Sequence, residues 1–164
     1  MQTIQLVRLL GARAIGWTRS ESKRAAIEEM GADDVICGMG ETTPVWQQLL
    51  DLTNGRGVDL VMDYVGSAAF NDGFRGLARL GRYVMVGELL GQEVHVNPTF
   101  IFYKRAKILG SSSHKREQVD QILEYIRQGA IKPFIGGRYP LDEIQKVHAL
   151  LEQGAITGRA VMVP

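Results

Sequence analysis

Cysteine is almost missing from this sequence of 164 residues, which contains only Cys37. A single thiol cannot close an internal disulfide, and no basic stretch followed by an apolar run opens the chain, so we expect a reducing, cytoplasmic setting. No apolar run approaches the roughly 20 residues that a membrane-spanning helix needs. These absences argue against a disulfide-stapled secreted domain, and they predict that the chain has no membrane partner.

The chain has little excess charge and few cysteine and histidine side chains. Nineteen Lys and Arg against eighteen Asp and Glu leave a net charge of +1, so we expect no nucleic-acid partner and favour a small molecule or a protein. A catalytic zinc needs about three protein ligands and a structural zinc about four. Cys37 and the scattered His95, His114 and His148 do not supply such a set, so we expect this chain to bind no zinc.

What the chain does contain is a regular alternation of two patterns. With 45% hydrophobic residues it can bury a core, and short β-branched runs alternate with longer segments of helical period. This alternation is typical of an α/β domain with a mainly parallel sheet. The strands are expected at residues 13–17, 33–36, 58–64, 82–86, 107–109 and 159–163.

The strand expected at 58–64 is the most apolar, and we expect it at the centre of a sheet because its residues leave no polar face. A helix capped by Ser67 and ended by Gly81 should follow it. The first helix, over residues 1–10, has no strand before it. The glycine-rich turn that binds a pyrophosphate in a doubly wound domain precedes that helix, so we expect the turn and the first strand to be missing.

Five ordered blocks carry a family resemblance: LGARAIGWTRSESKRAAIEEMGADDVI, GVDLVMDYVG, LARLGRYVMVGELLG, RAKILGSS and KPFIGGRYPLDEIQKVHALLEQGAITGRAVMVP. Together they resemble the C-terminal, nucleotide-binding portion of the medium-chain dehydrogenase/reductase superfamily, in its branch of zinc-type alcohol dehydrogenases and quinone oxidoreductases. The resemblance implies a Rossmann-like, doubly wound fold that lacks its first strand and Gly-rich loop. It also implies a partial dinucleotide-binding domain over residues 1–131 and, over residues 132–164, a return segment that in the family packs on the catalytic domain.

The resemblance implies part of an NAD(P)(H)-dependent oxidoreductase that transfers hydride to or from a small carbonyl, alcohol or enone. Thr18 occupies the end of a strand where an acidic residue would bind the adenosine ribose of NAD. Arg19, Ser20 and Lys23 follow, and these cations and hydroxyls could surround a 2′-phosphate, which favours NADP(H) over NAD(H). The alternative is an ordinary solvated helix start at which Ser20 is only the cap.

Two further pairs of cofactor contacts follow from the resemblance: Val65 and Gly66, and Gly87 and Glu88, in loops that line the ribose and nicotinamide. From the residues alone, each glycine could simply occupy a turn that needs a positive φ. The resemblance also implies that the acidic Asp63, at the end of its strand, is a structural or loop-ordering group rather than a catalytic one.

Because these residues belong to the cofactor side only, we expect the chain to be inactive alone. The missing central strand favours a homo-oligomer. A second hypothesis is a non-catalytic remnant that acts as a self-associating or partner-binding module. A third, a Rossmann-like methyltransferase suggested by VDLVMDYVG, is weaker, because such enzymes also need an early glycine-rich turn and because the C-terminal half follows the dehydrogenase pattern.

Overall fold

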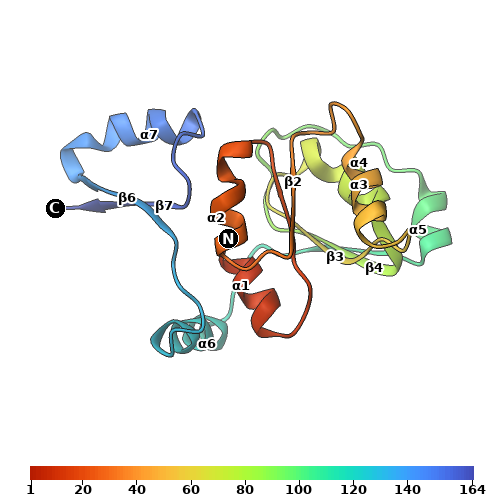
Figure 1. Ribbon diagram of the computed structural model, residues 1–164, viewed down its shortest axis with the longest axis horizontal. Coiled ribbons are helices and arrows are strands. Elements are labelled where there is room, and N and C mark those ends of the chain that lie inside the picture. The colour runs from red at the N-terminus through yellow and green to blue at the C-terminus, as the bar shows by residue number, and fades with distance from the viewer. The chain divides into compact units, whose positions relative to one another are not determined.

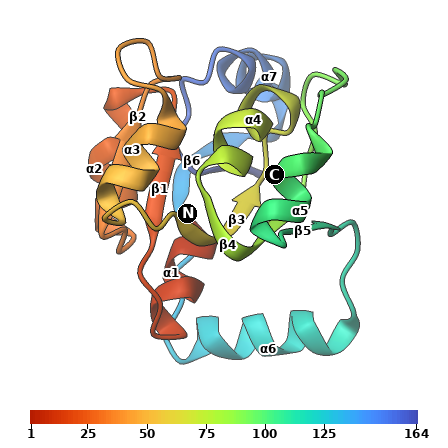
Figure 2. The same cartoon turned by 90° about the vertical axis from the view of Figure 1, so that its right-hand side faces the viewer.

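The computed structural model describes residues 1–164, and the chain divides into two compact units (Figures 1 and 2). One unit consists of residues 1–38 and 115–164, and the other of residues 39–114. Every strand pairing in the chain is parallel, which confirms the α/β class with parallel strands. No helix is long and apolar enough to cross a membrane, and the cytoplasmic setting stays a prediction.

The first unit begins with two parallel strands and the helices around them. Its first elements are α1 (Gln2–Leu9), β1 (Ile15–Thr18), the 3₁₀ helix η1 (Glu21–Lys23), α2 (Arg24–Glu29) and β2 (Asp34–Cys37). Ile15 pairs with Asp34 and Thr18 with Cys37. Gly16 lies so close to the side chain of Ile27 that a Cβ would overlap it, so a glycine in β1 lets α2 pack directly on the strand.

The same unit ends with a second parallel pair. Its later elements are α6 (Arg116–Arg127), β6 (Ile135–Pro140), the 3₁₀ helix η2 (Leu141–Glu143), α7 (Ile144–Glu152) and β7 (Arg159–Val163). β6 and β7 pair directly, with α7 in the connection between them. The side-chain amide of Gln5 bonds both the N–H and the carbonyl oxygen of Lys132 at 2.8 Å, which ties α1 to the segment before β6.

The second unit has one three-stranded sheet. Its elements are α3 (Val45–Leu52), β3 (Val58–Asp63), α4 (Ser67–Arg75), β4 (Leu77–Met85), α5 (Pro98–Lys104) and β5 (Lys107–Gly110), and the strand order is β3-β4-β5. Asn97 caps α5 because its side-chain oxygen accepts the N–H of Thr99 at 3.0 Å, and Pro98 takes the first helical position.

Four buried residues form the core of this unit: Phe70, Phe74, Leu77 and Tyr83. The Phe70 ring lies 5.6 Å from that of Phe74 and 4.8 Å from that of Tyr83, measured between centroids. These are distances at which aromatic rings attract beyond the effect of their burial. Because the four residues come from α4 and β4, the cluster fixes that helix on the sheet.

Two expectations about this unit are wrong. β3 is an edge strand of its sheet rather than a central one, and Leu60 on it is 37% exposed. The helix that begins at Ser67 ends at Arg75, because Gly76 follows it and the chain then enters β4. Gly81 lies inside β4, where the register with β3 shifts and Leu80 takes a φ of 66°. A local irregularity of the strand therefore explains the Leu80–Gly81 pair.

Candidate functional site

Thr18 is the last residue of β1, and a tight turn leads from it into η1. The Thr18 hydroxyl accepts a hydrogen bond from the N–H of Ser20 at 3.3 Å, which shapes this turn. The Ser20 hydroxyl bonds that of Ser22 at 2.7 Å and makes no cap bond to the backbone. The expectation that Ser20 caps a helix by its side chain is therefore wrong, because Ser22 takes up its hydroxyl and the first turn is 3₁₀ rather than α.

Two cations beside this turn have no acidic partner. Arg19 is exposed, and neither Arg19 nor Lys23 forms an ion pair. Glu21 lies between them in sequence but pairs with Arg24, whose guanidinium lowers the pKa of the Glu21 carboxyl. Arg24 also donates to the Val35 carbonyl oxygen at 2.9 Å, so this pair is anchored on β2. The turn after β1 and the 3₁₀ helix that follows it thus carry two cations without an acidic partner, and the ammonium of the second, Lys23, lies near Gly154.

In the second unit, a buried carboxylate orders the loop after β3. One oxygen of Asp63 accepts the N–H groups of Val65 at 2.8 Å and Gly66 at 2.9 Å, and the other accepts the Tyr83 hydroxyl at 2.5 Å. Asp63 is 4% exposed. These hydrogen bonds hold the loop and the core in place. They occupy both oxygens of the carboxylate, so Asp63 is not available to a ligand. The arrangement agrees with a loop-ordering role for Asp63.

Glu88 fixes the loop after β4, which lies at the same end of the sheet as the loop after β3. The carboxylate of Glu88 accepts the N–H of Ser67 at 2.6 Å and the Ser67 hydroxyl at 3.0 Å, at the first residue of α4. It also accepts the N–H groups of Leu90 and Gly91 at 2.9 and 3.0 Å. These hydrogen bonds hold the pKa of Glu88 below its ordinary value, and the bond from the Leu90 N–H has the largest effect.

The two glycines of these loops lie where a side chain would not fit. Gly66 has a φ of 88°, and a Cβ there would approach the Cα of Glu88 to 2.9 Å and overlap its carboxylate. A Cβ on Gly87 would lie 2.9 Å from the carbonyl oxygen of Tyr64. The loops that carry Val65, Gly66, Gly87 and Glu88 therefore touch each other at the carboxyl ends of β3 and β4, where α/β sheets bind ligands.

Ser67 and Tyr83 were not predicted as parts of this arrangement. Ser67 was expected only as a cap, whereas it is the partner through which Glu88 reaches the start of α4. Tyr83 showed no signal beyond its place in an apolar strand, because nothing in the sequence identifies the buried oxygen that its hydroxyl meets.

The side chains of this chain do not fit a zinc ion. No group of three or more His, Cys, Asp or Glu side chains is gathered in a way that could hold a metal. Burial, ahead of a hydrogen bond with Glu21, raises the pKa of the Cys37 thiol, whereas a zinc ligand must be a thiolate. We therefore derive no chemistry of this chain from zinc.

A family model described as zinc-binding dehydrogenase matches residues 1–128. The chain belongs to this family. The finding confirms the resemblance to zinc-type alcohol dehydrogenases and quinone oxidoreductases of the medium-chain dehydrogenase/reductase superfamily, and it removes the ground for a methyltransferase. Members of this dehydrogenase family use NAD(H) or NADP(H).

Individual relatives agree with this assignment. The chain is 31% identical to an NAD-dependent alcohol dehydrogenase of Sulfolobus acidocaldarius, in a match that covers 93% of this chain and 43% of the relative. It is 30% identical to a D-arabinose 1-dehydrogenase (NADP(+)) of Saccharolobus solfataricus, with 99% of this chain and 46% of the relative covered. The chain thus spans about half the length of the curated relatives that it matches.

A solved structure shows the same fold. The crystal structure of the alcohol dehydrogenase from the hyperthermophilic archaeon Aeropyrum pernix superposes with a TM-score of 0.89 at 30% identity. The match covers 98% of this chain and 46% of that one. The Rossmann-like fold class is confirmed.

Proposed function

We propose that this dehydrogenase chain supplies the NADP(H)-binding part of an oxidoreductase that transfers hydride to or from a small carbonyl, alcohol or enone. The observation that carries the cofactor preference is the pair of unpartnered cations, Arg19 and Lys23, beside a threonine at the end of β1. A relative named for NADP(+) lends support, while another named for NAD shows that family membership alone leaves the preference open.

Each residue of this turn has a distinct role in the proposal. The Arg19 guanidinium and the Lys23 ammonium bind the 2′-phosphate, the former with a planar fork of donors that matches an oxyanion. Thr18 contributes a neutral hydroxyl where a carboxylate would repel that phosphate. Ser20 exchanges its bond to Ser22 for one to the phosphate. The bound cofactor supplies the hydride chemistry itself.

The loop residues Val65, Gly66, Gly87 and Glu88 are proposed as further cofactor contacts. Support comes from their place at the carboxyl ends of β3 and β4, where α/β sheets bind ligands, and from the two glycines, which let the two loops come together there. Glu88 acts by fixing both loops through Ser67 and Leu90. We propose no catalytic residue on this chain, and we expect it to be inactive alone.

We also propose that the chain forms a homo-oligomer. β5 is an edge strand of its sheet, and Ile108 and Leu109 on it are 37% and 43% exposed. Exposed apolar edge strands readily pair with another chain. A second copy of this chain is the proposed partner, and light scattering that shows a stable monomer at micromolar concentration would contradict this proposal.

A titration with two fragments of the cofactor tests the proposed phosphate contacts. Calorimetry should show that 2′,5′-ADP binds more tightly than 5′-AMP, because the two differ only in the 2′-phosphate. Arg19→Ala should weaken binding of 2′,5′-ADP about tenfold, the typical cost of one charge-assisted hydrogen bond, and leave 5′-AMP nearly unchanged. Arg127→Ala, at an exposed arginine on α6 in the same unit, is the matched control. Equal binding of the two fragments would contradict the NADP preference.

A further inference from the structure

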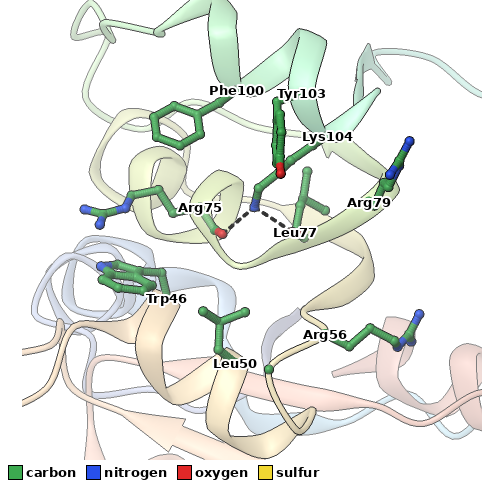
Figure 3. Close-up of a pocket in the computed structure, with 10 residues that line it drawn as sticks. Trp46, Leu50, Arg56, Arg75, Leu77, Arg79, Phe100, Tyr103 and Lys104 are labelled. Carbon is green, nitrogen blue, oxygen red and sulfur yellow. Dashed lines mark hydrogen bonds between the residues drawn. The ribbon is translucent and has the colours of Figure 1, made fainter.

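A pocket of about 370 Å³ lies in the unit of residues 39–114 (Figure 3). Residues just before β3 and the first residue of β4 line it, so it lies at the end of this sheet opposite to the loops that follow β3 and β4. It lies between α3 and α5, beside the end of α4 and the beginning of β4, where Leu77 is the first strand residue. Its volume falls within the range of roughly 300–1,000 Å³ that is common for small-molecule sites. The residues proposed above to contact the cofactor do not line it.

Several of the side chains that line the pocket are positively charged, and none of them is acidic. Four cations line it, and no Asp or Glu does. Arg56 is neutralised by Asp59, with nitrogen–oxygen distances of 2.7 and 2.6 Å. Arg75, Arg79 and Lys104 have no ion pair, and Arg79 is exposed. Three positive charges therefore remain uncompensated around a space that could admit an anion.

Two of these cations already hold fixed positions. The Lys104 ammonium donates to the carbonyl oxygens of Arg75 and Leu77, both at 2.6 Å, and so bonds the carboxyl end of α4. Burial, then the charge of Arg75, lowers the pKa of Lys104. The Arg75 guanidinium lies 4.1 Å from the centre of the Trp46 ring, within cation–π distance. Arg79 is the cation that remains free to bind a ligand.

Aromatic rings supply a second kind of surface in the same pocket. Phe100 and Tyr103 project from α5 and are 45% and 77% exposed. Figure 3 shows these rings on the α5 side, with Trp46 and Leu50 facing them from α3, Arg75 on one side of the view and Arg79 on the other. Exposed rings next to unpaired guanidinium groups suit a ligand that is flat at one end and anionic at the other.

We propose that this pocket binds a small aromatic oxyanion, a planar ring that carries a phosphate or carboxylate. The ring packs against Phe100 and Tyr103, and the oxyanion binds Arg79. Lys104 occupies carbonyl oxygens at the end of α4 and at the start of β4, so that their negative charge does not repel the ligand. The site is independent of the proposed NADP(H) contacts, because none of its lining residues belongs to them.

Calorimetry on the whole chain tests the two halves of the proposed ligand separately. The probes are phenyl phosphate, benzoate, phenol and inorganic phosphate. Phenyl phosphate or benzoate should bind at least about fivefold more tightly than phenol or phosphate, because only these two probes use both the rings and the cation. The tighter of the two identifies the oxyanion. No binding of either at about 10 mM, well above a millimolar dissociation constant, would overturn the proposal.

Matched variants locate the binding. Arg79→Gln should weaken the better probe about five- to tenfold, whereas Arg82→Gln, which removes an exposed arginine from the same strand but not from the pocket, should change it less than about twofold. Phe100→Leu should weaken it as well, and Phe102→Leu on the same helix, outside the pocket, should not. Binding that falls equally with each member of a pair, or that is lost in Arg19→Ala, would overturn the proposal.

Discussion

The hydroxyl of Tyr83 donates a 2.5 Å hydrogen bond to the carboxylate of Asp63, and both side chains are buried. Tyr83 belongs to the aromatic core, and Asp63 holds the N–H groups of Val65 and Gly66. Burial, ahead of the bond to Asp63, raises the pKa of Tyr83 far above its ordinary value, so the hydroxyl remains a donor. This bond links the packing of the core to the conformation of a candidate cofactor loop.

Tyr83→Phe should lower the free energy of unfolding by about 1–3 kcal/mol, because it leaves one oxygen of a buried carboxylate without its partner. Urea unfolding followed by tryptophan fluorescence measures this change. Tyr103→Phe is the control, since that tyrosine is 77% exposed. Equal stability of the two variants would show that the bond to Asp63 contributes nothing.

Gly66→Ala should destabilise the chain by about 2–4 kcal/mol, since it adds both a strained positive φ and an overlap with Glu88. Gly11→Ala isolates the first of these effects, because Gly11 has a φ of 78° and nothing within 4 Å of an added Cβ. It should cost only about 1 kcal/mol. If the two variants unfold at the same denaturant concentration, the contact between the loops is not tight.

The contribution of Glu88 to stability should depend on pH. Its pKa in the folded chain is lowered from an ordinary value near 4.5, so its stabilising effect is present above that value and is lost as the pH falls through the folded pKa. Melting temperatures of the wild type and Glu88→Gln should therefore differ at neutral pH and converge in acid. Glu93→Gln, at an exposed glutamate without a hydrogen bond, is the control. A gap that stays constant as the pH is lowered from neutral into acid, up to the point where both proteins unfold, would contradict this assignment.

The elements that the sequence predicted well have strong local signals. α1 lies within the helix expected over residues 1–10, and the N–H of Gly11 just beyond it bonds the Arg8 carbonyl oxygen. α6 carries Val119, Ile122, Leu123 and Ile126, apolar residues at the spacing of one helix face that the sequence alone shows. The parallel pairing of β1 with β2 also follows from the predicted alternation of strand and helix. In each case the periodicity of the apolar residues sufficed, without any knowledge of distant contacts.

The elements that were missed depend on contacts that no local pattern contains. β6 was not predicted, because Gly136, Gly137 and Pro140 are poor strand residues and only its pairing with β7 makes it a strand. α5 was missed because it has only seven residues, although Asn97 and Pro98 are a regular start signal. β3 was placed at a sheet centre from its apolar residues, but apolar content does not show which neighbours a strand has.

The candidate site was predicted unevenly for the same reason. Thr18, Arg19, Ser20 and Lys23 are close in sequence, so their common turn could be predicted. Glu88 and Ser67 are 21 residues apart, and only the folded chain shows that the Glu88 carboxylate caps the start of α4 by accepting the Ser67 N–H. The domain boundary near residue 131 stays a prediction, as does the binding role of every site residue.

The affinities of the chain for NADPH and NADH, measured with the wild type and with Arg19→Ala, test the central proposal most directly. The proposal predicts that the wild type binds NADPH about tenfold or more tightly than NADH, and that Arg19→Ala lowers this ratio about tenfold, since one charge-assisted contact is worth about a factor of ten. Arg127→Ala should leave the ratio unchanged. NADH binding as tightly as NADPH, with a ratio that does not respond to Arg19→Ala, would contradict it.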